Sequence, residues 1–338
     1  MPTQSTSPGL GYWDIRNASP KRDAGLQGED MSAQLNLVAK RQATWSQAAN
    51  VFKKRIDIVR WLVFALAITG ALLAAAASQT PDTPEALTLH RILTAIGTVL
   101  LAAGTFISAR LLKETEIQGW VRMRAASEAL KREAFKYAAG ARPYDDAQAD
   151  QNLDHACASI EKDLDDLSDR TVASDSTGSV PLNKITKEEY RDSRMSQVAS
   201  FYRPRAQHYK KIASRWRACE FVLALAATIV TALAGVVGKV GIGAGFQFDL
   251  AALTAVLTTV SGAILAHIEA ARYQYLVTSY LATARRLEDA SVEFDAASAD
   301  PQKWSDYVNG CEDILAAENS SWVAGWTKSR NPQAVSNG

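Results

Sequence analysis

The chain contains four long apolar segments, arranged as two pairs with the same internal spacing. The segments cover residues 61–78, 92–112, 219–237 and 250–268. A membrane-spanning helix needs roughly 17–25 mostly apolar residues, because the hydrocarbon core of a bilayer is about 30 Å thick. All four segments meet that length. We therefore expect an all-α, polytopic membrane protein whose four transmembrane helices form two consecutive two-helix hairpins.

A constant shift in numbering relates the two hairpins. Phe52-Lys53-Lys54 and Tyr209-Lys210-Lys211 are 157 positions apart, and the same shift maps Arg60 onto Arg217, Leu130 onto Leu287 and Tyr137 onto Phe294. No gap is needed across both apolar segments and the stretch that follows them. The pattern predicts a tandem duplication of one unit.

The composition between and beyond the hairpins sets the expected domain boundaries. Residues 170–184 are rich in Ser, Thr and Gly and contain Pro181, as is typical of a linker. We expect a disordered tail over residues 1–32, a first two-helix unit over 33–169, a second over 185–326, and a disordered tail over 327–338.

The distribution of Lys and Arg predicts the orientation of the helices. Basic residues cluster before the first and third apolar segments and after the second and fourth, whereas the two hairpin loops carry only His90, Arg91 and Lys239. Cytoplasmic flanks of membrane helices are enriched in Lys and Arg. We therefore expect both termini and the linker in the cytoplasm, with both hairpin loops on the other side.

The polar regions are expected to form long cytoplasmic helical bundles. Residues 113–139 contain no Pro and many strong helix formers, so the second membrane helix is predicted to continue through them without a break. A further helix carries a heptad pattern at Leu153, Cys157, Ile160, Leu164 and Leu167.

The sequence carries no recognisable catalytic, cofactor or metal motif. Its three cysteines (Cys157, Cys219 and Cys311) and four histidines have no ligand spacing, and Val240 stands where a P-loop needs Ser or Thr. The 37 basic and 36 acidic residues do not favour direct nucleic-acid binding. We expect no enzyme, no cofactor and no metal, and a hairpin turn in the Gly-rich stretch 235–246.

Small and hydroxylated residues recur at helical spacing inside the apolar segments. They are Gly104, Thr105 and Ser108 in the second segment, and Thr254, Thr258, Ser261 and Gly262 in the fourth. Small residues let membrane helices approach closely, and hydroxyls can bond across the contact. The stripes therefore fit packing between helices, and they also fit a face that lines a pore once several copies assemble.

One ionisable residue lies about a turn inside an apolar segment. Glu220 follows Arg217 by three residues, a spacing at which the two can pair at the membrane interface. We expect this ion pair near the start of the third membrane helix.

Two short motifs resemble those of the bacterial SLATT domains. Tyr190, Arg194, Gln197, Tyr202 and Ala206 lead into Lys210-Lys211 before the third apolar segment, and a Glu-Asn-x-x-Trp motif follows at Glu318, Asn319 and Trp322. The first half resembles a more divergent member, because it lacks the Glu-Asn-x-x-Trp ending. The resemblance implies a structural role for these motif residues in the bundle.

The resemblance implies a two-helix membrane effector of bacterial conflict systems, located in the inner membrane. Such a protein is expected to form a homo-oligomer and to perturb the bilayer in response to infection. The implied partners are a nucleotide-signalling enzyme, a sensor or a reverse transcriptase. A membrane-anchored helical scaffold and a regulated ion channel without toxicity remain alternatives.

Overall fold

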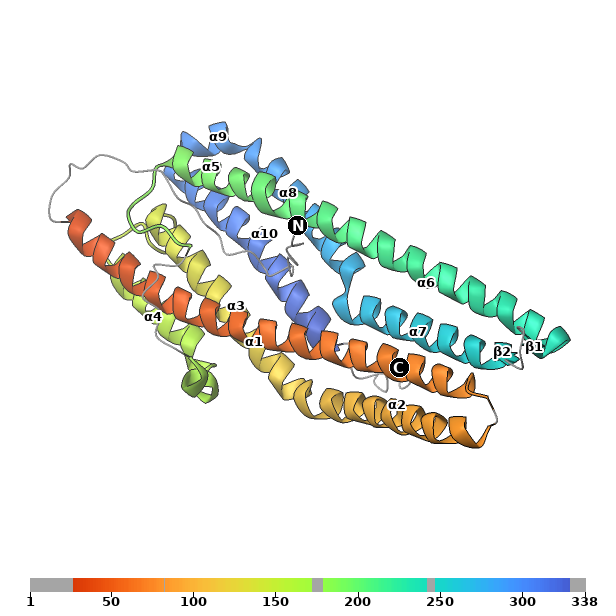
Figure 1. Ribbon diagram of the computed structural model, residues 1–338. Helices are drawn as coiled ribbons and strands as arrows, with labels where there is room; N and C mark the ends of the chain where they lie inside the picture. The colour runs from red at the N-terminus through yellow and green to blue at the C-terminus, as the bar shows by residue number, and fades with distance from the viewer. Residues whose placement is uncertain (1–26, 82, 172–178, 242–246, 329–338) are drawn as a thin grey trace, which may run out of the picture. The chain divides into compact units, whose positions relative to one another are not determined.

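The computed structural model describes residues 27–81, 83–171, 179–241 and 247–328, and these are almost entirely helical (Figure 1). The helices are α1 (Gln27–Ser78), α2 (Pro84–Leu111), α3 (Glu114–Ala138), α4 (Ala149–Lys162), η1 (Asp165–Arg170), α5 (Lys187–Gln197), η2 (Val198–Tyr202), α6 (Arg203–Val237), α7 (Leu250–Ala271), α8 (Tyr273–Ser291), α9 (Phe294–Ser298) and α10 (Pro301–Lys328). The predicted all-α class is confirmed.

A short antiparallel hairpin joins α6 to α7. Its strands β1 (Lys239–Gly241) and β2 (Gln247–Asp249) pair with Lys239 opposite Asp249. The strands flank the predicted Gly-rich turn, whose residues 242–246 lie outside the described part of the chain.

The described residues divide into two compact units that do not follow the two sequence halves. One unit, here called the bundle, contains residues 27–54, 114–171, 179–204 and 279–328. The other, here called the apolar unit, contains residues 55–81, 83–113, 205–241 and 247–278. Each unit therefore draws helices from both halves of the sequence.

The apolar unit contains the membrane segments. Four helices among the described residues are long and apolar enough to cross a membrane: Met31–Ser78, Pro84–Leu111, Lys187–Val237 and Leu250–Ser291. Large apolar side chains on them point outward, including Val99 (64% exposed), Phe106 (70%) and Phe221 (65%). Exposed apolar side chains in such numbers are typical of a surface that contacts a membrane or another protein. The helices therefore indicate a multi-pass membrane protein, as the sequence predicted.

Helices α1 and α2 pack closely through glycine. A Cβ built on Gly70 would lie 2.8 Å from Leu101 Cγ and 3.0 Å from the Gly97 carbonyl oxygen, and a Cβ on Gly97 would lie 3.0 Å from the Gly70 carbonyl oxygen. Glycine at both positions allows the two backbones to approach, as is usual for membrane helices. Gly104 continues the same contact, since its Cβ would lie 3.5 Å from Leu66 Cβ.

Polar contacts join the two hairpins at their loops. The Gln79 side chain donates from Nε2 to the Asp249 carbonyl oxygen at 3.0 Å, and Asp249 N donates to Gln79 Oε1 at 2.7 Å. The Asp249 carboxylate also accepts hydrogen bonds from the backbone of Ala251 and Ala252, which caps the start of α7. Both hairpin loops therefore lie at the same end of the apolar unit.

The second membrane helix does not continue unbroken into the bundle, so that prediction is wrong. Helix α2 ends at Leu111, and α3 begins at Glu114. The equivalent helix of the second half is also interrupted, because Arg272 adopts a left-handed conformation (φ 51°) between α7 and α8. Residues with strong helix propensity surround the first break, so tertiary packing overrides local preference there.

The bundle has a continuous core formed by both sequence halves. Leu130 on α3, Leu153 on α4 and Leu287 on α8 are completely buried. Trp304 on α10 donates from Nε1 to the Ala139 carbonyl oxygen at 3.0 Å. Four of the five predicted heptad positions are buried and Ile160 is half-buried, although α4 ends at Lys162 and a 3-10 turn carries the last of them.

The described residues include only parts of the predicted tails and of the predicted linker. Helix α1 begins at Gln27 and α10 ends at Lys328, so ordered helix extends into the ranges 1–32 and 327–338 that were expected to be tails. Most of both tails, and residues 172–178 of the predicted linker, lie outside the described residues.

Candidate functional site

Helix α5 presents three motif residues on one face. A capping box formed by Thr186 and Glu189 fixes its start. Tyr190, Arg194 and Gln197 follow at spacings of four and three, which aligns them on one side of a helix. All three are buried, at 0%, 1% and 4% exposure.

Arg194 forms a buried ion pair with Glu312 on α10. Arg194 Nε donates to Glu312 Oε1 at 2.9 Å, Nη2 donates to the same oxygen, and the Tyr190 hydroxyl donates to it at 2.7 Å. The guanidinium also lies over the Phe135 ring, 3.7 Å from its centroid. Burial favours the neutral form of Arg194, but the interactions with Glu312 and Tyr190 together outweigh it and raise the pKa of the guanidinium.

A π-helical turn follows α5 directly. It covers Val198–Tyr202, and Arg203 at its end donates its backbone N–H to the Val198 carbonyl oxygen. Such wide turns are rare and occur frequently at functional sites. This one carries Phe201 and Tyr202, whose rings pack edge to face and also contact Tyr280 on α8.

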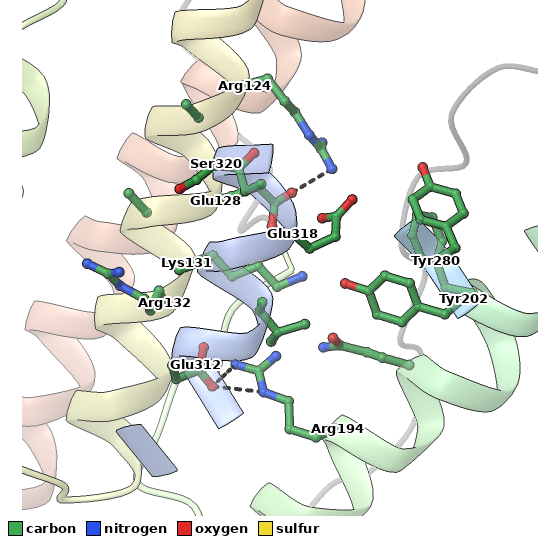
Figure 2. Close-up of a pocket in the computed structure, with 17 residues that line it drawn as sticks. Arg124, Glu128, Lys131, Arg132, Arg194, Tyr202, Tyr280, Glu312, Glu318 and Ser320 are labelled. Carbon is green, nitrogen blue, oxygen red and sulfur yellow. Dashed lines mark hydrogen bonds and ion pairs between the residues drawn. The ribbon is translucent and has the colours of Figure 1, made fainter. Parts of the chain in front are cut away.

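These elements enclose a cavity of about 280 Å³ in the bundle (Figure 2). Its walls come from α3, α5, η2, α8 and α10. The lining residues are Arg124, Ala125, Glu128, Ala129, Lys131, Arg132, Arg194, Gln197, Phe201, Tyr202, Tyr280, Glu312, Leu315, Ala316, Glu318, Asn319 and Ser320. Four of these side chains are basic and three are acidic, which is a high density of charge for an interior space.

Two carboxylates at this cavity are held at different pKa values. Burial and the neighbouring Glu128 charge raise the pKa of Glu318 to about 7. Burial also raises the pKa of Glu128, but the nearby positive charges together outweigh that effect and lower the pKa overall. They are Arg124, whose Nη2 lies 2.6 Å from Glu128 Oε1, Lys131 and Arg194. At neutral pH Glu128 is therefore ionised, while Glu318 is divided between its two forms.

Lys131 brings a buried amine to the same cavity. It is 7% exposed, and burial lowers its pKa to about 8, against an opposing effect of Glu128. Figure 2 shows the Lys131 amine, the Tyr202 hydroxyl and the Glu318 carboxyl turned toward a common space. The cavity thus combines buried cations, hydroxyl and amide groups, and aromatic rings.

The structure brings most of the predicted motif residues together. Arg194, Gln197, Tyr202, Glu318 and Asn319 all line the cavity, although they come from two segments more than 100 residues apart. The Trp322 side chain lies outside the described part of the structure. The structural role predicted for these residues stays a prediction.

Sequence reasoning missed the remaining charged walls of the cavity. Arg124, Glu128 and Lys131 on α3 were not singled out, and neither was Glu312. Glu128 and Lys131 are three positions apart, a spacing that places them on one side of a helix, but no sequence pattern marked that side as the inner one.

Some residues of the predicted small-residue stripes pack against a neighbouring helix, and others are exposed. Gly104 packs against α1, Ser108 is half-buried, and Thr105 is exposed. The Thr231 hydroxyl donates to Thr254 Oγ1 at 3.4 Å, so Thr254 faces α6. Thr258 and Gly262 are exposed, and no described atom lies within 4 Å of a Cβ built on Gly262.

Glu220 has a partner other than the predicted one. Its Oε1 accepts a hydrogen bond at 3.3 Å from the buried hydroxyl of Ser261 on α7. Arg217 is exposed. Ser261, rather than Arg217, therefore lies against the Glu220 carboxylate in the described structure.

Comparison with known proteins finds two family models that each match part of the chain. Residues 190–322 match the family model described as SMODS and SLOG-associating 2TM effector domain 1 (SLATT_1). Residues 43–152 match a different model, described as a protein of unknown function (DUF4231). No curated protein and no solved structure matches the chain. The stretch from Tyr190 to Trp322 is therefore similar to a SLATT_1 domain, and the tandem duplication stays a prediction.

Proposed function

We propose that the protein is a multi-pass membrane effector that assembles into oligomers and perturbs the bacterial inner membrane. It acts in a conflict system directed against viruses, through assembly of its helices and without a catalytic step. The proposal is supported by the effector description of the matched domain and by four long helices with outward apolar side chains.

The observation that carries the proposal is an exposed small-residue face on α7. It consists of Ala251, Ala255, Thr258, Thr259, Gly262 and Ala266, all of which are exposed. Their spacing places them along one side of the helix. Small residues permit close helix–helix contact in lipid, where packing rather than water exclusion drives association. We propose that this α7 face contacts another copy of the chain and can line a pore.

The expected orientation follows from basic residues near the helix ends and from the paired loops. The Gln79–Asp249 contacts keep both hairpin loops at one end of the apolar unit, which favours both termini on the opposite, cytoplasmic side. The description of the matched domain names association with SMODS and SLOG proteins. We propose that a nucleotide-signalling enzyme, a sensor or a reverse transcriptase supplies the signal.

The test is inducible expression in a bacterium, with growth and membrane potential recorded with and without phage. The wild-type chain should depolarise the membrane once triggered, because assembly opens a path through the bilayer. Gly262→Leu should abolish depolarisation, since bulk on the α7 face blocks close contact. The matched control is Ala102→Leu on α2, an exposed position between the bulky Val99 and Phe106, which should leave activity unchanged.

The outcomes separate the alternatives. A scaffold would keep the potential intact under every trigger and would tolerate Gly262→Leu. A regulated channel would conduct without arresting growth. Equal activity of wild type and Gly262→Leu, with both inserted in the membrane, would contradict the α7 face as the assembly surface.

A further inference from the structure

We propose that the bundle cavity is a binding site for a small organic phosphate, a molecule that joins a phosphate group to a flat ring. The site lies in the bundle and binds its ligand independently of how the membrane helices assemble. It is formed by the residues that line the cavity, chiefly Arg194, Lys131 and Tyr202.

The first observation is an unsatisfied buried cation. Arg194 is 1% exposed, and its Nη1 has no hydrogen-bond partner among the described residues, although its other two nitrogens bind Glu312. Buried guanidinium N–H groups are normally all paired, because leaving one unpaired is costly. Figure 2 shows the third nitrogen directed away from Glu312, on the side of Lys131. An oxyanion in the cavity would satisfy it.

The second observation is the charge balance around that nitrogen. The lining contains four basic side chains (Arg124, Lys131, Arg132 and Arg194) and three acidic ones (Glu128, Glu312 and Glu318). Glu318, with its pKa of about 7, supplies only part of a negative charge at neutral pH, whereas Lys131, with a pKa of about 8, remains mostly protonated. A cationic excess therefore remains at neutral pH. Since the excess lies beside hydroxyl and amide donors, it fits a tetrahedral anion with several acceptor oxygens.

The third observation is the aromatic wall. Phe201, Tyr202 and Tyr280 form a cluster with ring centroids 5.2 to 5.7 Å apart, and all three line the cavity. The π-helical turn positions the first two. A volume of about 280 Å³ suits a single ring with one phosphate, at the lower end of ligand cavities.

The experiment is calorimetric titration of the full-length chain in detergent with four probes: phenyl phosphate, inorganic phosphate, benzoate and phenol. We expect saturable one-to-one binding of phenyl phosphate, weaker binding of inorganic phosphate and benzoate, and none of phenol. Affinity should fall as the pH rises from 7 to 9, because Lys131 loses its proton over this range. Absence of binding by both phosphates would overturn the proposal, and so would equal binding of phenol.

Variants test the site itself. Lys131→Met should weaken phenyl phosphate binding about tenfold or more, which is the loss expected for one charged hydrogen bond. The matched control is Lys136→Met on the same helix, which pairs with Glu133 and does not line the cavity. Tyr202→Phe, which removes one hydroxyl and keeps the ring, should weaken binding with little effect on folding. Unchanged affinity in both Lys131→Met and Tyr202→Phe would contradict the assignment.

Discussion

Arg194 takes part in several different interactions inside the bundle. It combines an ion pair with Glu312, a contact with the Phe135 ring, and a place on the cavity wall. The sequence motif identified Arg194 itself, together with Gln197 and Tyr202. It could not identify Glu312 as the partner, because the two are 118 positions apart and only the packing of α5 against α10 brings them together.

Replacing either member of this ion pair should strongly destabilise the bundle. Arg194→Ala and Glu312→Ala each leave a buried charge without its partner, so we expect each to lower the free energy of unfolding by about 3–5 kcal/mol. The double variant should lose much less than the sum, because neither charge then remains. Chemical denaturation in detergent, followed by circular dichroism, measures all three.

The exposed pair Arg203–Glu288 provides the matched control. Its side chains are 51% and 38% exposed, so Arg203→Ala should lower the free energy of unfolding far less than either buried variant. Losses of similar size at Arg194 and Arg203 would contradict the importance assigned to the buried pair.

Glu318 should make the stability of the bundle depend on pH. Its folded-state pKa of about 7 is above its ordinary value of 4.5, so the folded chain holds the proton more tightly than the unfolded chain. Its contribution is fully present below pH 4.5 and is lost as the pH rises through 7. Glu318→Gln should remove this fall, which we expect to be about 1–3 kcal/mol. The test is to measure the melting temperatures of wild type and Glu318→Gln between pH 4.5 and 8. Parallel pH profiles of the two proteins would contradict the role assigned to Glu318.

The membrane helices differ in how they use glycine. On α1 and α2, Gly70 and Gly97 allow two backbones to touch, whereas Gly262 on α7 has open space around it. The sequence predicted the four spans well, because 18 or more apolar residues have few alternatives to a membrane helix. It did not distinguish the buried glycines from the exposed one, since both kinds occur in similar small-residue stripes.

Replacing glycine with alanine should distinguish a glycine at a close helix contact from an exposed glycine. Gly97→Ala should destabilise the α1–α2 hairpin by about 1–3 kcal/mol, because the new Cβ would lie 3.0 Å from a backbone oxygen that cannot move freely. Gly262→Ala should leave the thermal stability in detergent unchanged. The comparison requires only melting curves of the two variants beside wild type, and an equal loss in both would refute the assignment.

At the scale of the whole molecule, both units combine helices from the two sequence halves. Most of the heptad and motif positions are buried, yet the cavity depends on α3 meeting α5, α8 and α10, which no local pattern encodes. The interruption after Leu111 was likewise missed, because local helix propensity does not register it.

Reporter fusions should place both hairpin loops on one side of the membrane. Fusions at residue 81 and at residue 241 should report the outer side, and a fusion within 170–184 should report the cytoplasm. The reason is the Lys and Arg clustering at the other ends of the helices, together with the Gln79–Asp249 contacts. Opposite locations for the two loops would contradict the topology.

Dye release from vesicles tests the central claim, which is that these helices assemble in the bilayer and make it permeable. Purified full-length protein reconstituted into dye-loaded vesicles should release the dye with a steep dependence on protein density once activated. Gly262→Leu should insert equally well and release none, and Ala102→Leu should behave as wild type. Vesicles that stay sealed with inserted wild-type protein, in the presence of every candidate partner, would contradict the account.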